Sequence, residues 1–192
     1  MFPLTLKVTV LGTVLLLLLG CSPNSLPSPV YTRFSNLQPA SPVDSKLDQP
    51  ANDFALIFEY GACGTDRLDT FRGDFTQDRL IESPMTTPIT MTLSDKISIY
   101  QKMLDINFFS YPSHYTIPPA ADGSITQVIP ATHYLFIVRN QDQTKTVEWL
   151  DNIVEPKTVE AERLRELAHL LIDLIKAKPE VKRLPELTAG CA

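Results

Sequence analysis

Proline recurs six times between residues 22 and 50, and this spacing constrains the fold of the chain more than any other feature of its sequence. Each proline fixes φ and removes a backbone donor, so neither a helix nor a sheet propagates through such a stretch. Serine, asparagine and glutamine fill many of the other positions, a composition typical of an extended spacer. We therefore predict a Pro/Ser-rich tether over residues 21–52 and a single folded domain over residues 53–192.

The first twenty residues have the pattern of an export signal. Lys7 precedes an uncharged run over residues 8–19. This run has about a dozen residues, whereas a membrane-spanning helix needs about twenty. It leads into LLGC, which resembles the lipobox of bacterial lipoproteins. The resemblance implies a signal peptide over residues 1–20, cleavage after Gly20 and attachment of diacylglycerol to Cys21. An ordinary signal peptide and an uncleaved short anchor are the alternatives.

The predicted lipid anchor also predicts where in the cell the domain lies. Lipid on Cys21 would tie it to the cell membrane or the outer membrane, with the domain outside the cytoplasm. Two or more acyl chains anchor a protein firmly in a membrane, whereas one acyl chain alone anchors it only marginally. Ser22 resembles the sorting residue of outer-membrane lipoproteins, but the sequence leaves both membranes open.

Charge narrows the range of partners. The chain has 17 basic and 22 acidic residues, a formal net charge of −5. Nucleic-acid binding requires clustered Lys and Arg, so we expect no nucleic-acid partner. The same acidic excess argues against electrostatic docking on anionic lipid.

The first half of the domain has the patterns of three strands and one helix. Residues 54–60 (FALIFEY) predict a central strand, and residues 67–76 predict a half-buried strand paired with it as a hairpin. A shorter strand is expected over residues 88–93. Thr92 or Ser94 can cap a helix that continues to about residue 105.

The second half has the patterns of two more strands and a second helix. An irregular stretch over residues 110–132 precedes strands at 133–139 and 145–150, which a turn at 140–143 connects. Pro156 is expected in the first turn of a long amphipathic helix. The predicted class is therefore α+β, with an antiparallel sheet of about five strands in β-β-β-α-β-β-α order and two helices packed on one face.

Several segments of the domain resemble a family of uncharacterised bacterial lipoproteins. The matching segments are FEYGACGTDRLDTFRGDFTQD, INFFSYP, VEWLDNI and LRELAHLLIDLI running into LPEL. They span most of residues 54–187, and the first is the most specific. The resemblance implies architecture and location only, since the family provides no activity and no catalytic residue.

The irregular stretch is the best candidate for a binding site, because structureless segments of this length inside a compact domain often bind something. Its aromatic and imidazole side chains, with a tryptophan on a later strand, could stack on a sugar or clamp a peptide. The alternative is that the aromatic residues cover one end of the sheet. The candidate ligand-binding residues are Tyr111, His114, Tyr115 and Trp149.

The two cysteines that lipid does not use form a possible disulfide. Cys63 and Cys191 would lie in an oxidising compartment, where disulfides persist. Their pairing would close nearly the whole domain, which the loop-entropy model values at roughly 4–5 kcal/mol. The alternative is two unpaired thiols.

Enzymatic chemistry has little support in the sequence. No Walker loop, G-x-S-x-G, H-E-x-x-H or S-x-x-K motif is present. We expect no cofactor, no catalytic residue and no metal, because the arginines interleaved with the carboxylates of the first hairpin indicate a salt-bridged surface. Those carboxylates are Asp66, Asp69, Asp74 and Asp78.

The sequence thus predicts a membrane-anchored lipoprotein whose domain is a non-enzymatic envelope binding or interaction module. Its expected partners are a cell-wall polymer, a peptide or an envelope protein. One alternative is an envelope hydrolase that uses scattered carboxylates or Cys63. Another is a structural lipoprotein that spaces or stabilises an assembly.

Overall fold

A computed structural model describes residues 49–186 of the chain. Contacts divide the chain into Met1–Ser41 and Pro42–Ala192, and the description concerns the second unit. The predicted signal peptide, the lipidation site Cys21 and nearly all of the predicted tether lie outside the described residues. Within residues 49–186, no helix is both long enough and apolar enough to cross a membrane.

Seven strands form one sheet in the described part of the chain, in the spatial order β4-β3-β2-β1-β6-β7-β5. All neighbouring strands are antiparallel except β5 and β7, which are parallel. The strands are β1 (Ala55–Gly61), β2 (Asp66–Asp69), β3 (Asp74–Arg79), β4 (Glu82–Pro88), β5 (His114–Tyr115), β6 (Thr126–Asn140) and β7 (Gln143–Glu155).

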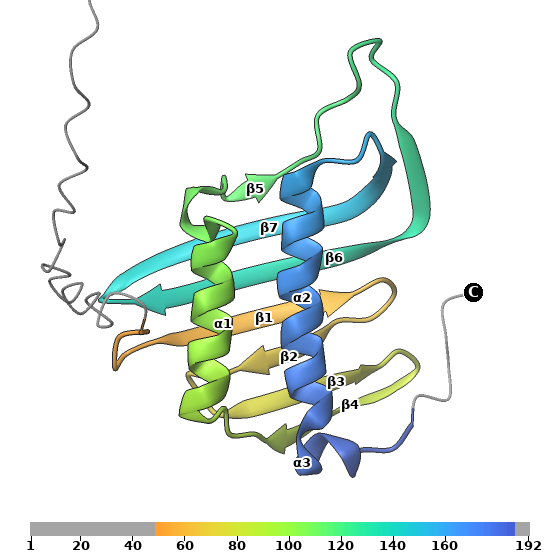
Figure 1. Ribbon diagram of the computed structural model, residues 1–192. Helices are drawn as coiled ribbons and strands as arrows, with labels where there is room; N and C mark the ends of the chain where they lie inside the picture. Colours follow the sequence, from red (N-terminus) through yellow and green to blue (C-terminus); the bar gives the residue numbers. More distant parts are fainter. Residues whose placement is uncertain (1–48, 187–192) are drawn as a thin grey trace, which may run out of the picture. The chain divides into compact units, whose positions relative to one another are not determined.

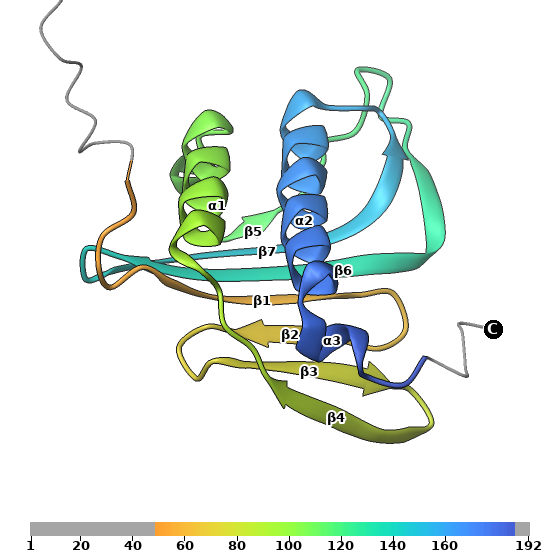
Figure 2. The same cartoon turned by 60° about the horizontal axis from the view of Figure 1, so that its bottom comes forward.

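Helices cover one face of this sheet. The elements are α1 (Leu93–Asp105), the short 3-10 turn η1 (Phe108–Ser110), α2 (Val159–Ala177) and α3 (Pro179–Lys182). Figures 1 and 2 show α1 and α2 on the same face, and no helix of the described chain lies on the other face. The α+β class and the placement of two helices on one face are therefore confirmed.

The predicted strand count and order are wrong. The sheet has seven strands rather than about five, and it is mixed rather than antiparallel because β5 and β7 are parallel. The chain order of strands and α-helices is β-β-β-β-α-β-β-β-α-α. The predicted strand over residues 67–76 is two strands, because the buried Asp69 carboxylate accepts hydrogen bonds from the backbone N–H groups of Phe71 and Arg72 and turns the chain. The predicted strand at 88–93 lies earlier, as β4.

Three other boundaries differ from the predictions. The irregular stretch over residues 110–132 contains β5 and the start of β6. The last helix begins at Val159, not at Pro156, because the Thr158 side chain caps it by accepting the N–H of Ala161. A short helix, α3, follows at Pro179.

Local signals explain the boundaries that were predicted correctly. Thr92 and Asp95 form a capping box at the start of α1, in which each side chain accepts the other residue's backbone N–H. Gln141 and Asp142 both have positive φ, the conformation of a two-residue hairpin turn. Their N–H groups donate to the Asp53 carboxylate at 3.0 and 2.9 Å, so the start of the domain is bound to the β6–β7 turn.

The core lies between the sheet and the two helices. Alternate residues of the central strands point toward the helices and are almost fully buried, as a period of two requires. Each fully buried side chain of this size stabilises the fold by roughly 1.5–3 kcal/mol. From the sheet these residues are Leu56, Phe58, Leu68, Phe75, Phe136, Val138, Val147 and Trp149, and from the helices Ile99, Met103, Leu164, Leu167, Leu171 and Ile175.

Candidate functional site

The segment between α1 and β6 places its side chains at the end of the sheet beside β7. After η1 the chain pairs with β7 only briefly, through His114 opposite Glu148 and Tyr115 opposite Trp149. Because neighbouring residues of a strand point to opposite faces, His114 lies on the open face and Tyr115 points toward the helices. The predicted binding residues are thus divided between the two faces.

The three predicted aromatic residues are buried. Tyr111, Tyr115 and Trp149 are 6%, 9% and 1% exposed. Tyr115 meets both Tyr111 and Trp149 edge to face, with ring centroids 5.4 and 5.6 Å apart. The Trp149 ring is also covered by Tyr134 and by the Arg165 guanidinium. These ring faces therefore serve the packing of the sheet end, which argues against stacking on a sugar.

Hydrogen bonds fix these tyrosines to the start of α2. The Tyr111 hydroxyl donates to the carbonyl of Glu160 at 2.9 Å. The Tyr115 hydroxyl lies 3.1 Å from the Thr158 hydroxyl. Burial raises the pKa of Tyr111 to about 12, and burial also raises the pKa of Tyr115. Both side chains remain neutral at physiological pH, and their hydrogen bonds hold the segment that lines the site.

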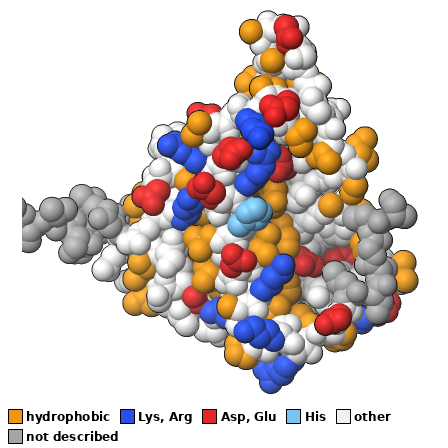
Figure 3. Space-filling model, turned by 45° about the vertical axis from the view of Figure 1, so that its right-hand side comes forward, with side chains coloured by type: hydrophobic (Ala, Val, Ile, Leu, Met, Phe, Trp, Pro, Cys, Tyr) orange, Lys and Arg blue, Asp and Glu red, His pale blue; other side chains and the backbone are white. Residues whose placement is uncertain are grey.

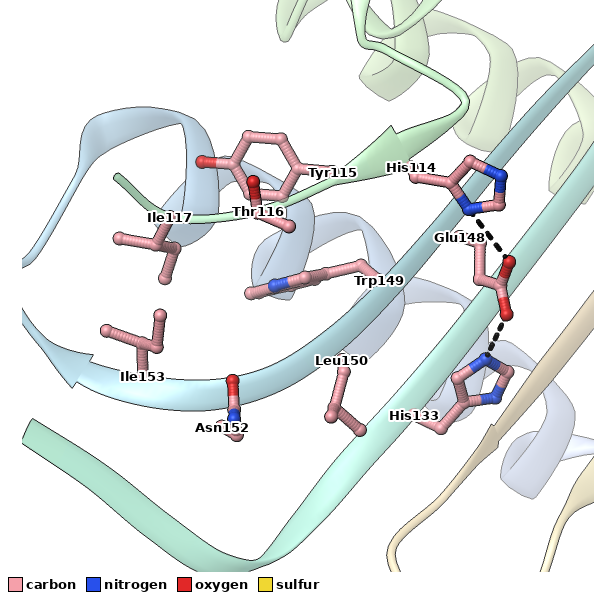
Figure 4. A pocket seen from close by; sticks show the side chains of 10 residues that line it. All are labelled: His114, Tyr115, Thr116, Ile117, His133, Glu148, Trp149, Leu150, Asn152 and Ile153. Carbon is pink, nitrogen blue, oxygen red and sulfur yellow. Dashed lines mark hydrogen bonds and ion pairs between the residues drawn. The ribbon is translucent and has the colours of Figure 1, made fainter. Parts of the chain in front are cut away.

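A pocket of about 390 Å³ lies beside β7 (Figure 4). Ile117 and Ile153 face each other across it, and the edges of Tyr115 and Trp149 lie between them and the core. Three of the four predicted binding residues, His114, Tyr115 and Trp149, line the pocket, and Tyr111 does not. The other lining residues are Thr116, Ile117, His133, Glu148, Leu150, Asn152 and Ile153.

The polar end of this pocket is a carboxylate between two imidazoles. His114 Nδ1 lies 3.1 Å from one oxygen of Glu148, and His133 Nε2 lies 3.1 Å from the other. His114 and Glu148 are register partners on β5 and β7, whereas His133 reaches Glu148 diagonally from β6. The side chain of His114 is 81% exposed, that of Glu148 is 43% exposed and that of His133 is 35% exposed. Water and ligands can therefore reach this group.

The His114–Glu148–His133 group supports recognition rather than metal chemistry. In the part of the chain that the structure describes, no three His, Cys, Asp or Glu residues are arranged to hold a metal ion. A carboxylate accepts hydrogen bonds, and an imidazole can donate or accept them. Such a group beside an apolar pocket suits a ligand with both polar and apolar parts.

Cys63 is disulfide-bonded. A sulfur in a disulfide offers no thiol, so Cys63 does not serve as a nucleophile in this state. Cys21 and Cys191 both lie outside the described residues, and the pairing of Cys63 with Cys191 stays a prediction.

The carboxylates of the first hairpin serve local structure. Asp69 pairs with Arg67 at 3.1 Å, and Asp74 pairs with Arg72 at 3.4 Å. Asp78 accepts the N–H groups of Thr65 and Leu80. Hydrogen bonds from these groups lower its pKa. The interleaved arginines therefore pair with Asp69 and Asp74 as predicted, but Asp69 is buried rather than on the surface, and Asp78 binds backbone N–H groups instead of an arginine.

No family model matches the chain, and no curated protein matches it. The resemblance to uncharacterised bacterial lipoproteins therefore stays a prediction.

Proposed function

We propose that this chain is a lipid-anchored lipoprotein of a bacterial cell envelope and that its domain is a non-enzymatic binding module. The observation that supports binding is the accessible pocket beside β7, which joins the His114–Glu148–His133 group to an apolar interior. The lining joins polar and apolar contacts in one accessible pocket, the arrangement typical of a ligand-binding site.

The proposed location rests on the sequence of the first 21 residues. Lipid on Cys21 would hold the domain outside the cytoplasm, at the cell membrane or the outer membrane, within reach of a cell-wall polymer, a peptide or an envelope protein. Metabolic labelling with an alkyne fatty acid tests this directly. We expect label on the wild-type chain and none on a Cys21→Ala variant, which should also leave the membrane fraction. A wild-type product of unmodified mass would contradict the anchor.

The binding proposal is tested with fractions of the host envelope. Full-length protein in detergent is immobilised and exposed separately to wall polymer, membrane proteins and the peptides released from them. Leu150 lines the pocket and is 51% exposed, so Leu150→Glu alters the site at little cost to the core. Leu93→Glu is the matched control, since Leu93 is 70% exposed at the start of α1 and does not line the pocket.

We expect at least one fraction to be retained by the wild type and by Leu93→Glu. Retention should fall about tenfold with Leu150→Glu, because a bound ligand would cover the new carboxylate and remove its water. Retention that is equal for all three proteins, or absent for all three, would contradict binding at this pocket.

A further inference from the structure

Among residues 49–186, no strand pairs with one edge of β7 along its second half. β5 pairs with β7 at Glu148 and Trp149 only, and the chain then leaves the sheet as residues 116–125. β7 itself continues to Glu155, paired on its other side with β6. The residues from Leu150 to Glu155 therefore present their outer backbone edge to the pocket.

The direction of the backbone groups follows from one hydrogen bond. The N–H of Glu148 donates to the carbonyl of Ser113 at 2.8 Å, so it points away from β6 and toward β5. Backbone groups of a regular strand alternate in direction, so the N–H groups of Leu150 and Asn152 point the same way. The register with β6 shifts between Ile153 and Glu155, so this alternation is not extended to Val154. Beyond the end of β5, the N–H of Asn152 points into the space where a further strand would lie.

The side chains beside this edge match the two faces of an added strand. On the helix side, Ile117 and Ile153 form an apolar cleft (Figure 4). On the open side, Leu150 and Val154 are 51% and 42% exposed, with Asn152 between them. Figure 3 turns the right-hand side of Figure 1 forward and shows hydrophobic side chains in the upper right part and in bands through the middle, with charged side chains of both signs between them.

We propose that an extended polypeptide segment of a partner protein adds to the sheet along β7 from Leu150 to Glu155, in line with β5. This inference rests on the proposed function and names the ligand class of the same pocket. Free backbone groups on one edge recur every second residue, about 7 Å apart, and another polypeptide backbone has the matching repeat. An apolar side chain of the segment enters between Ile117 and Ile153, and polar groups reach the His114–Glu148–His133 group.

A separate peptide fits this edge better than the described chain or a second folded copy does. Asp53 is bound to the β6–β7 turn, so the described chain begins at the opposite end of β7 from the free edge. Residues 116–125 follow β5 beside the pocket, with Ile117 facing Ile153 across it, so an extended peptide needs less room at this edge than a second folded domain does.

The test begins with a phage-displayed library of random peptides of about a dozen residues, long enough to form a strand. Selection uses the full-length chain in detergent, and affinities of synthetic copies are measured by fluorescence anisotropy. Two variants at position 152 separate the contribution of the backbone N–H to binding from that of the side chain. Asn152→Pro removes the outward N–H and is tolerated where an edge N–H faces away from the sheet. Asn152→Ala keeps the N–H and removes only the side chain.

We expect Asn152→Pro to weaken peptide binding about tenfold, since it removes an edge hydrogen bond. Asn152→Ala should weaken binding by a clearly smaller factor, because it removes a side chain that lines the pocket but keeps the edge N–H. N-methylation of alternate residues of the peptide should weaken binding to the wild type by a factor similar to that of Asn152→Pro. This second arm keeps the proposal testable even if Asn152→Pro fails to fold.

Recovery of no peptide, or binding that is insensitive to both Asn152→Pro and N-methylation, would overturn the proposal. So would a concentration-dependent dimer that Asn152→Pro abolishes, because the occupant would then be a second copy. A wall polymer whose retention depends on Leu150 but not on the N–H of Asn152 would overturn strand addition and leave the proposed function standing.

Discussion

The β4 edge of the sheet carries Pro84 and Pro88, whereas β7 carries no proline before Pro156. The N–H of Ile89 donates to the carbonyl of Gly73, so the preceding Pro88 places its ring, not a donor, on the outer side. Proline on an exposed edge is a common protection against pairing with another chain. At the other end of the sheet, β5 covers two residues of β7 and leaves the rest open.

This comparison shows that the fold protects the β4 edge against pairing with another strand and leaves part of the β7 edge open to such pairing. An open edge is a risk for aggregation unless it is short or has a function. The open stretch of β7 is short and lies beside the pocket that contains the His114–Glu148–His133 group. We infer that the difference between the edges reflects binding at β7.

The largest expected effect concerns the core beneath the two edges. Trp149 under β7 and Phe75 under the β4 side are 1% and 2% exposed. We expect Trp149→Ala and Phe75→Ala each to lower the free energy of unfolding by about 3–5 kcal/mol, because each leaves a large cavity. Chemical denaturation followed by circular dichroism measures this. If Trp149→Ala lowered the free energy of unfolding by less than about 1 kcal/mol, packing around Trp149 would not be what stabilises the β7 end of the sheet.

A smaller effect is expected at the ion pair between Asp95 and Lys178, which joins the start of α1 to the end of α2. The two side chains are 15% and 13% exposed and lie 2.5 Å apart. Burial works to raise the pKa of Asp95, but hydrogen bonds from Lys178 and Thr92 outweigh it, and the net pKa is lowered. Asp95→Asn should cost about 1–2 kcal/mol near neutral pH and leave peptide affinity unchanged.

The sign of its pH dependence follows from the lowered pKa. The contribution is fully present above the unfolded pKa of about 3.9 and is lost as the pH falls through the folded value. The stability difference between wild type and Asp95→Asn should therefore shrink below about pH 4. A difference that grows on acidification would contradict the assignment. A change in peptide affinity would show that the two ends of the sheet are coupled.

Much of this architecture was predictable because its signals are local. Thr92 caps α1, Gln141 and Asp142 form the β6–β7 turn, and α2 has a regular apolar stripe. The start of β6 was missed because Pro130 indicates a loop. In the structure Pro130 lies among residues 128–131, which fall outside the ladder between the pairs Gln127–Ile153 and Thr132–Asp151.

The candidate site was predictable only in part. Tyr115 and Trp149 were identified as aromatic residues near a loop, but their burial depends on packing against α2, which no local pattern reveals. His133 and Glu148 were missed, although a signal existed. A hairpin turning at residues 140–143 pairs Leu135 with Glu148 and so brings His133 to the diagonal position. The strand β5 could not be predicted from the sequence, since a strand of two residues has no hydrophobic periodicity.

A still smaller effect is expected from Glu148→Gln. Glu148 is 43% exposed, and exposed ion pairs contribute less than about 1 kcal/mol, so the free energy of unfolding should change by no more than that. Peptide affinity should fall a few-fold, because the amide accepts more weakly from His114 and His133. A large loss of stability with unchanged affinity would make the group structural. Glu162→Gln on the exposed surface of α2 is the control.

The smallest effect is expected at the protected edge. Pro88→Thr restores an outward N–H on β4, opposite Asp74 in the ladder. We expect self-association to increase by a few-fold at most in sedimentation velocity, since one added edge hydrogen bond contributes about 0.5–1.5 kcal/mol. No increase at any concentration would show that Pro88 is not what closes this edge.

Amide hydrogen exchange of the free protein along β7 tests the open edge most directly. Asp151 and Ile153 pair with β6, so their amides should exchange slowly, whereas the amide of Asn152, which points to the pocket, should exchange fast. Slow exchange at all three residues would mean that the edge is already covered, and it would contradict the account.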